Sequence, residues 1–291
     1  MIDRPLFPPL APPPRGVEAG LYLVATPIGN LRDITLRALD VLAAADLVLA
    51  EDTRVSGKLL AAYGLKAKLE RCDDHASARA AEIAIERIRE GAVVALVSDA
   101  GTPMVSDPGY VVARAVIAAG LPLHPIPGAS SLLAALMLAG LPADRVTFAG
   151  FLPPKSAARN AMLEELRPGR QTLVFFESGP RLRDSLTDMA AVLGQRPAAV
   201  TRELTKLYED CVRGPLDALA QDPALDGPKG EIVVVVAPGD AEVATEADAD
   251  AALTEALTRL PPGEAAAEVS KALNLSRKPL YRRALELKGV G

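Results

Sequence analysis

The stretch VVALVSDAGTPMVSDPG, residues 93–109, decides how this chain is expected to fold. Its first part, 93–97, is continuously apolar, which is typical of a strand buried on both faces of a parallel sheet. The segment after residue 97 can neither continue the strand nor form a regular helix. Gly101 permits a positive φ, and Pro103 disfavours the right-handed helical conformation at Thr102. The pattern therefore predicts a buried strand that runs into an irregular loop.

A second break, at 106–109, precedes an apolar helix that we expect to start near Tyr110. Asp107 suits the N-cap of this helix, and Pro108 suits its first turn. The loop would then lie between the carboxyl end of a parallel strand and the start of a helix, which is where open α/β sheets bind ligands. An ordinary strand–helix turn is the alternative interpretation.

The same arrangement occurs twice more nearby. An apolar strand is expected over 21–25 and ends in the loop 26–30, and another is expected over 121–126 and ends in the loop 127–131. All three loops are rich in Pro, Gly, Ser and Thr. Together they predict one pocket rim made of backbone groups and small hydroxyls, which suits a polar small molecule.

Strand and helix patterns alternate along most of the chain, which predicts an α/β protein of two domains. The first is expected to be a doubly wound, mostly parallel sheet. The second is expected to be a mixed α/β domain, because 201–213 has the pattern of a hairpin. The expected segments are a disordered Pro-rich lead-in (1–19), the N-terminal α/β domain (20–142), the second α/β domain (143–239), an acidic linker or helix (240–263) and a basic segment resembling a helix-turn-helix (264–291).

Composition narrows the possible functions. The two cysteines are far apart and only two histidines are present, which argues against a disulfide framework and a metal site. No apolar run is long enough to span a bilayer, and the N-terminus lacks the apolar region of a signal peptide, so we expect a cytoplasmic protein without membrane contact. The net charge of −5 argues against a uniformly basic surface, so any nucleic acid should meet a local patch.

The C-terminal segment offers such a patch. Between Ser276 and Lys288 the chain carries five basic side chains and one acidic one. The candidate phosphate contacts are Arg277, Lys278, Arg282 and Arg283. A solvated helix face is the alternative interpretation of the same charges.

Seven motifs occur in an order that is characteristic of one family. They are TPIGNLRDIT (26–35), AEDTR (50–54), SDAGTPMVSDPG (98–109), PIPGASS (125–131), FAGFLPPK (148–155), FFES (175–178) and TRELTKLYE (201–209). On these motifs the chain resembles the bacterial small-subunit ribosomal RNA cytidine 2′-O-ribose methyltransferases, which belong to the tetrapyrrole methylase superfamily. The resemblance implies a tetrapyrrole-methylase-like fold with a small C-terminal helical segment. It also implies S-adenosylmethionine as methyl donor, no metal, a homodimer, and 16S ribosomal RNA in the small ribosomal subunit as partner.

The resemblance also implies which residues bind the donor, in a cleft between the two domains. Carried over motif by motif, they are Pro27, Ala100, Gly101, Thr102, Val105, Ser130, Ser131, Phe176 and Leu204. The acceptor is expected to be the 2′-hydroxyl of a cytidine in the decoding region. Because a ribose hydroxyl is a weak nucleophile, a general base would help. The candidates are Asp52, Asp107, Glu177, Glu203 and Lys206, of which we prefer Glu177 and Glu203.

Two other functions stay open at this point. A tetrapyrrole methyltransferase, acting on a precorrin or uroporphyrinogen, would use the same donor pocket on a small anionic macrocycle. A nucleotide-sensing or adaptor module would bind without turnover. The motifs TPIGNL, AEDTR and FLPPK favour the ribosomal RNA enzyme, as does a basic C-terminus that a small-molecule enzyme does not need.

Overall fold

The computed structural model describes residues 16–73, 76–106, 109–239, 246–273 and 275–289. Most of the predicted Pro-rich lead-in, Asp107 with its proposed capping role, and the start of the acidic segment lie outside these residues. The chain divides into a large unit, comprising residues up to Arg167 and Gln171–Ala237, and a helical unit whose main part begins at Pro238. Each unit is described by itself.

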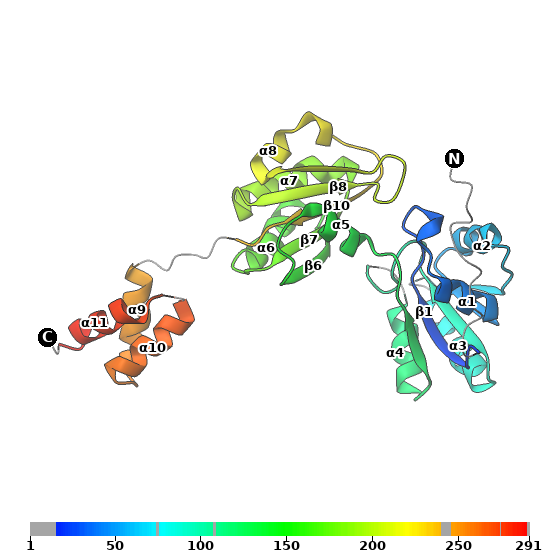
Figure 1. Ribbon diagram of the computed structural model, residues 1–291, viewed down its shortest axis with the longest axis horizontal. Coiled ribbons are helices and arrows are strands. Elements are labelled where there is room, and N and C mark those ends of the chain that lie inside the picture. The colour runs from blue at the N-terminus through cyan, green and yellow to red at the C-terminus, as the bar shows by residue number, and fades with distance from the viewer. Residues whose placement is uncertain (1–15, 74–75, 107–108, 240–245, 274, 290–291) are drawn as a thin grey trace, which may run out of the picture. The chain divides into compact units, whose positions relative to one another are not determined.

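The first sheet of the large unit is entirely parallel, with the strand order β3-β2-β4-β1-β5, and its strand β1 is labelled in Figure 1. Its strands are β1 (Gly20–Val24), β2 (Leu47–Ala50), β3 (Leu69–Arg71), β4 (Val93–Val97) and β5 (Leu123–Ile126). Because the strands are parallel, their carboxyl ends share one edge of the sheet. The motif loops that follow β1, β2, β4 and β5 therefore gather at that edge.

Helices cover both faces of this sheet. They are α1 (Leu36–Ala44), α2 (Thr53–Ala62), α3 (Ser77–Arg89) and α4 (Tyr110–Ala118). Side chains alternate along β4: Val93, Ala95 and Val97 belong to the core shared with α1 and α2, whereas Val94 and Leu96 belong to the core shared with α3 and α4. A strand buried on both faces needs the continuous apolar run seen in the sequence. The predicted doubly wound parallel sheet is thus confirmed.

The second sheet is mixed, with the order β6-β7-β10-β8-β9. Its strands are β6 (Val146–Phe151), β7 (Thr172–Ser178), β8 (Pro197–Arg202), β9 (Asp210–Pro215) and β10 (Glu231–Val236). Only β6 and β7 pair in parallel, and β8 and β9 form the antiparallel pair predicted for the hairpin. A mixed second domain is therefore confirmed.

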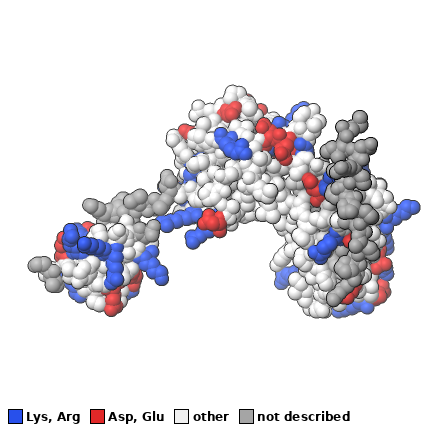
Figure 2. Space-filling view, viewed as in Figure 1, with Lys and Arg blue, Asp and Glu red and all other residues white. Residues whose placement is uncertain are grey.

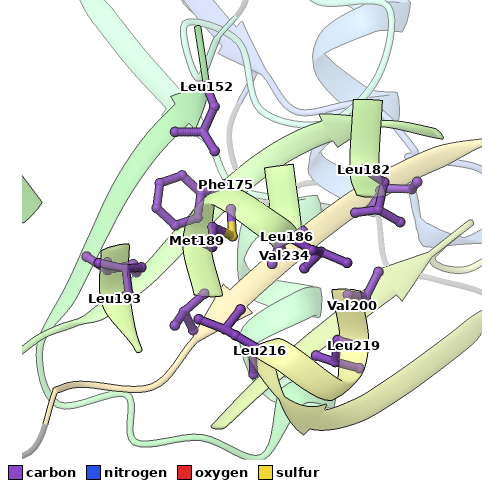
Figure 3. Packing of buried hydrophobic residues seen from close by; sticks show 14 of the residues in the cluster. Leu152, Phe175, Leu182, Leu186, Met189, Leu193, Val200, Leu216, Leu219 and Val234 are labelled. Atoms are coloured by element: carbon purple, nitrogen blue, oxygen red, sulfur yellow. The ribbon is translucent and has the colours of Figure 1, made fainter. Parts of the chain in front are cut away.

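One face of the second sheet carries the largest hydrophobic core found among the described residues. It is covered by α6 (Ser156–Leu166), α7 (Gly179–Leu193) and α8 (Leu216–Gln221). Phe175 of β7 and Val234 of β10 are fully buried there and contact Leu186 and Met189 of α7 (Figure 3). Since helices fill this side, ligand access to the second sheet must come from its other face or its edges.

The opposite face of the second sheet is covered by α5 (Ser131–Ala139), the helix that directly follows β5 of the first sheet. Ala135 and Ala139 pack on Ala199 and Val233, and Ile28 from the loop after β1 joins the same core cluster. Small alanines let the helix lie close to the sheet. This packing brings the carboxyl edge of the first sheet next to β7 and β10.

Two short elements were not predicted. The edge strand β3 has three residues that are only partly buried, so it shows neither an apolar run nor an alternation. Helix α8 has six residues, fewer than a helical pattern needs to stand out. Other element bounds differ from the predictions by a few residues, as when β5 starts at Leu123 rather than at 121.

Among the described residues, the helical unit contains two helices close to the segment expected to resemble a helix-turn-helix and a third in the segment expected to be an acidic linker or helix. They are α9 (Glu246–Leu257), α10 (Pro262–Leu273) and α11 (Arg277–Leu287). Leu253, Val269 and Leu280, one from each helix, are buried together. Part of the acidic segment is thus a helix that the other two need for their core.

Among the described residues, no helix is both long and apolar enough to cross a membrane. The same residues contain no group of three or more His, Cys, Asp or Glu side chains arranged to hold a metal ion.

Burial of Cys72 predicts a pH dependence of stability. Desolvation, with smaller contributions from Asp73 and Glu51, raises the pKa of the Cys72 thiol to about 11. The folded protein therefore keeps a proton that the unfolded chain releases, and stability should fall as the pH rises from about 9 to about 11. Urea denaturation across this range should show the decrease, and Cys72→Ala should make the curve flatter. An equally steep curve in that variant would contradict the assignment.

Candidate active site

A cavity of about 430 Å³ lies where the carboxyl edge of the first sheet meets β7 and β10 of the second. It is lined by residues of the motif loops and of the two strands: Ile28, Glu51, Asp99, Ala100, Gly101, Thr102, Val105, Ser106, Ser130, Ser131, Phe151, Phe176, Glu177, Ser178, Gly230, Glu231, Ile232 and Val233. The lining combines small, hydroxyl-bearing and apolar groups. This composition is typical of small-molecule sites with a few placed polar groups.

The loop after β4 is fixed to the loop after β1 by a two-way backbone bridge. Gly101 N donates to Thr26 O at 3.0 Å, and Thr26 N donates to Gly101 O at 2.8 Å. The buried Thr26 hydroxyl also donates to Ser98 O at 3.2 Å. Gly101 has a φ of +79°, and a Cβ there would lie 3.2 Å from Cγ2 of Ile28. Glycine is therefore required both for this turn and for the close approach of the two loops.

The loop after β5 is attached to the same structure. The Thr102 hydroxyl donates to Ala129 O at 3.2 Å. Ser130 occupies the N-cap position of α5, but its side chain makes no capping hydrogen bond, and it lines the cavity. The cavity wall is thus a set of three interlocked loops that carries a hydroxyl not used by its own helix.

Backbone strain is concentrated beside the cavity. Four described residues other than glycine have a positive φ: Met104, Ser106, Glu203 and Thr205. The first two lie in the loop after β4, and the other two lie in the connection between β8 and β9. Non-glycine residues in this conformation are uncommon and tend to cluster at functional sites. Both strained segments belong to motifs that the sequence singled out.

Most of the donor-binding residues expected from the sequence come together here. The cavity is lined by Ala100, Gly101, Thr102, Val105, Ser130, Ser131 and Phe176. Pro27 and Leu204 lie outside the lining. Leu204 is buried in the core under α5, and Ile28 rather than Pro27 contributes from the loop after β1.

The sequence analysis missed several residues of the lining, among them Glu51, Asp99, Phe151 and Glu231. Asp99 also accepts a hydrogen bond from Asp52 N at 3.0 Å, which joins the loops after β2 and β4. Glu51, Asp99 and Phe151 stand within the recognised motifs, so their positions in those motifs were the available signal. Glu231 stands in no motif, and only the pairing of β10 places it at the cavity.

Glu177 lines the cavity, but its carboxylate is already engaged. Its Oε1 accepts from Ser178 N at 2.8 Å, and its Oε2 accepts from the buried Ser185 hydroxyl at 2.6 Å. Arg181 lies one turn further along α7, with Nε 3.5 Å from Oε1. The Glu177 side chain is fully buried. This arrangement fixes the start of α7 against β7, and it favours a positioning role for Glu177 over proton transfer.

Glu203 lies outside the lining, in an ion-pair cluster with Lys206 and Glu231. Its Oε1 accepts from Lys206 Nζ at 2.8 Å and from Glu231 N at 3.0 Å. The hydrogen bond from Lys206 and the one from the Glu231 backbone lower the pKa of Glu203, which makes it a weaker base. A Cβ on Gly230 would lie only 2.5 Å from the same oxygen. The geometry thus assigns Glu203 to the support of the loop.

Lys206 and Asp52, the other described candidates, also have structural partners. Lys206 Nζ contacts Glu231 Oε2 at 2.9 Å as well as Glu203. Asp52 caps α2 by accepting from Arg54 N at 2.8 Å and pairs with the Arg54 side chain. The side-chain hydrogen bond from Arg54 lowers the pKa of Asp52 to about 2. Asp107 lies outside the described residues.

The basic residues of α11 differ in their engagement. Arg283 pairs with Asp250 of α9 at 2.6 Å and with Glu286 at 2.8 Å. Arg277 donates from Nη2 to Gly263 O at 3.1 Å, whereas Lys278 and Arg282 are exposed. Figure 2 shows several Lys and Arg side chains on the visible face of this unit. Arg283 therefore contributes to packing of the helices, and Lys278 and Arg282 are better placed to meet a partner.

Comparison with known proteins gives two family matches that together span most of the chain. The profile of the Tetrapyrrole (Corrin/Porphyrin) Methylases matches residues 20–220, and that of the RsmI C-terminal HTH domain matches residues 243–288. A protein of Mesorhizobium japonicum named ribosomal RNA small subunit methyltransferase I is 50% identical over 278 residues, covering 95% of both chains. The protein of the same name from Erythrobacter litoralis is 51% identical over 272 residues, covering 94% of this chain and 96% of that one.

Solved structures agree with this relationship at the level of the fold. A cobalt precorrin-4 methyltransferase has a TM-score of 0.56 at 23% identity and covers 77% of this chain and 97% of its own. A uroporphyrin-III C-methyltransferase from Thermus thermophilus, solved with S-adenosylhomocysteine, has a TM-score of 0.52 at 21% identity, covering 75% and 97%. The chain belongs to the ribosomal RNA small subunit methyltransferase I family of the tetrapyrrole methylases.

Proposed function

We propose that this protein transfers a methyl group from S-adenosylmethionine to the 2′-oxygen of a cytidine in the decoding region of 16S ribosomal RNA. Membership of the family supports ribosomal RNA as substrate. The related methyltransferase solved with S-adenosylhomocysteine supports the donor. The observation that carries the proposal is the cavity that the motif loops form between the two sheets.

The residues of the cavity suit a reaction that depends on alignment. The donor, when bound, supplies a methyl group on a sulfonium that is already a good leaving group. The interlocked loops around Gly101 and Thr102 would hold it by backbone groups, and Phe151 and Phe176 would shield it from water. Rigid placement of the reacting atoms accounts for a large part of such catalysis. The chain then has to orient the acceptor hydroxyl along the line of the breaking bond.

Binding of the large anionic substrate is assigned to the helical unit. An acidic chain with a net charge of −5 needs a local basic surface to bind RNA, and α11 offers one. A cytoplasmic location belongs to the same proposal, because an enzyme of ribosomal RNA acts where ribosomes are assembled. The homodimer that the family resemblance implies is also part of it.

Methyl transfer to isolated small ribosomal subunits tests this proposal. Subunits from a strain lacking the corresponding gene are incubated with the protein and labelled donor, and the RNA is then digested to nucleosides. Label in 2′-O-methylcytidine derivatives is expected. Label on a base alone contradicts the ribose assignment, and label on an added precorrin or uroporphyrinogen but not on RNA favours the tetrapyrrole methyltransferase. The absence of label from every acceptor favours a binding module.

The exposed cations of α11 are expected to contribute to RNA affinity but not to donor binding. In the variant Lys278→Ala/Arg282→Ala, affinity for small-subunit RNA should decrease, and the salt dependence of binding should lose about 0.7–0.9 of slope for each phosphate contact removed. The control Lys58→Ala/Lys66→Ala removes two exposed cations from α2 of the large unit and the loop that follows it. Filter binding at several salt concentrations separates the two. Equal losses of RNA affinity in both variants would mean that only the net charge of the protein determines RNA binding.

A further inference from the structure

A second hollow, of about 540 Å³, adjoins the cavity described above. The two share Ile28 and Ser130, so they meet at the loops after β1 and β5. Asp33 and Thr35 line the second hollow on one side, and Thr205 contributes from the connection between β8 and β9. A molecule in this groove would therefore lie next to a donor held in the first cavity.

Two polar atoms of this groove have no hydrogen-bond partner among the described residues. They are Oδ2 of Asp33 and Oγ1 of Thr205, and both are buried. Buried polar groups in native proteins are almost always satisfied, so each exception calls for an explanation. Here the two residues that carry the exceptions line the same hollow, although they are 172 residues apart in the sequence. A ligand that supplies both partners would explain them together.

The position of Thr205 is imposed by its surroundings. Its φ is +65°, an uncommon conformation for a β-branched residue. The backbone is held there because Thr205 N donates to Glu209 Oε2 at 2.6 Å, and Lys206 next to it pairs with Glu203 and Glu231. On the other wall, Asp33 ends a single helical turn that Asn30 caps. Both side chains are thus attached to backbone that is held in place by hydrogen bonds.

The chemistry of the pair indicates which ligand fits. An ionised carboxylate only accepts hydrogen bonds, whereas a hydroxyl both donates and accepts. Phosphate oxygens and the carboxylates of a tetrapyrrole would be repelled by Asp33. A ribose fits, because one hydroxyl can donate to Asp33 while a neighbouring oxygen contacts Thr205. The groove therefore favours a neutral sugar edge over an anionic group.

We propose that this groove is the acceptor subsite, in which Asp33 receives the hydrogen bond of the ribose 2′-hydroxyl and Thr205 contacts the adjacent ribose oxygen. This inference rests on the proposed function. In the reaction, the bond between sulfur and the methyl carbon breaks and its electron pair stays on sulfur. The bond between the 2′-oxygen and the methyl carbon forms, and the hydroxyl proton passes to Asp33 and then to water. Asp33 takes the role for which Glu177 and Glu203 are poorly placed.

Two nearly isosteric variants test the assignment. Asp33→Asn keeps the shape of the side chain but cannot take the proton, and Thr205→Val removes only the hydroxyl. Single-turnover methyl transfer to small subunits should slow by at least about a hundredfold in Asp33→Asn, the range of a lost general base. Thr205→Val should slow transfer by about tenfold, as expected when one hydrogen bond to the acceptor is lost.

Donor affinity and a control variant separate this role from a structural one. Calorimetry with S-adenosylhomocysteine should give the wild-type affinity for both variants, and Asp40→Asn on α1 should transfer at the wild-type rate. A rate within threefold of wild type in Asp33→Asn overturns the proposal. If that variant fails to fold, an unchanged rate in Thr205→Val overturns it instead. If the wild-type protein methylates no RNA, the proposed function fails, and the acceptor subsite fails with it.

Discussion

Replacing Arg159 with methionine is expected to lower the free energy of unfolding by about 3–5 kcal/mol, the usual range when one partner of a buried ion pair is removed. Arg159 of α6 and Asp188 of α7 approach to 2.6 Å, with side chains only 5% and 16% exposed. The Ser156 hydroxyl also donates to Asp188, at 2.9 Å. Without the guanidinium, a carboxylate would remain largely buried and lacking its main partner.

An exposed ion pair of the same helix provides the matched control. Arg167 follows α6 and pairs with Glu164 at 3.2 Å, but both side chains are 54% exposed. Such a pair contributes at most about 1 kcal/mol, so Arg167→Met should change stability little. Urea denaturation measures both variants, and an unchanged m-value shows that the comparison concerns stability alone.

The double variant Arg159→Met/Asp188→Leu distinguishes the ion pair from simple packing. Because it leaves no uncompensated charge, it should lose less stability than Arg159→Met alone. A loss in the double variant equal to the sum of the two single losses would show that the side chains act independently. Since Arg159 also donates to Pro153 O at 3.4 Å and Pro154 O at 3.3 Å, the pair holds the FLPPK motif in place. The ion pair between Arg159 and Asp188 is therefore expected to stabilise the loop of the FLPPK motif as well as the core.

The sequence allowed the cavity to be located because strand direction makes the inference geometric. Once β1, β4 and β5 were recognised as parallel strands, their loops had to meet at one edge of the sheet. The apolar runs at 21–25 and 93–97 show this directly, since only strands buried on both faces lack polar alternation. The loops that carry Gly101 and Ser130, which are 29 positions apart, were placed at one pocket rim in this way, whereas their role in donor binding was implied by the family resemblance.

The roles of the acidic residues could not be predicted in the same way. Glu177 stands at a strand end in a motif, as a general base would. Its oxygens are taken by Ser178 and Ser185, and only the packing of α7 on β7 reveals this. Leu204 presents the same difficulty, because its place in the core under α5 depends on the strained backbone around Glu203 and Thr205. A motif gives the type of a residue. Whether the oxygens of that residue are free to accept a proton depends on its neighbours in the folded structure.

The charge pattern of the C-terminal segment likewise could not show which basic side chains have acidic partners. Arg283 counted toward a basic face in the sequence, yet it pairs with Asp250, which lies 33 residues earlier in the acidic segment. The two segments of opposite charge that the sequence treats separately are one packed unit. Only the cations without such a partner can be assigned to RNA with a physical reason.

Donor binding is expected to be most sensitive to position 101. In Gly101→Val, affinity for S-adenosylhomocysteine should fall by more than about a hundredfold, a loss of about 2.7 kcal/mol. The new side chain would begin 3.2 Å from Ile28 Cγ2 at the wall of the cavity, where neighbouring backbone leaves little room. Calorimetry on the purified variant measures the loss directly.

Gly101→Val is also expected to lower the free energy of unfolding, and this effect needs its own control. Gly101 has a φ of +79°, and a left-handed conformation costs a non-glycine residue about 1–2 kcal/mol. Gly64, at the end of α2, has a similar φ of +67°, but a Cβ there would meet nothing within 4 Å. Gly64→Val should therefore lose comparable stability in urea while keeping the wild-type affinity for S-adenosylhomocysteine.

Comparing Gly101→Val with Gly64→Val separates the effect of backbone strain on donor binding from the effect of a new side chain at the cavity wall. If backbone strain alone weakened donor binding, both variants would bind poorly, because both adopt the same unfavourable conformation. If the close approach of the loop to the donor matters, only Gly101→Val loses affinity. Wild-type affinity in a folded Gly101→Val protein would place the donor away from this loop. The bridge between Gly101 and Thr26 would then serve only to join β1 to β4.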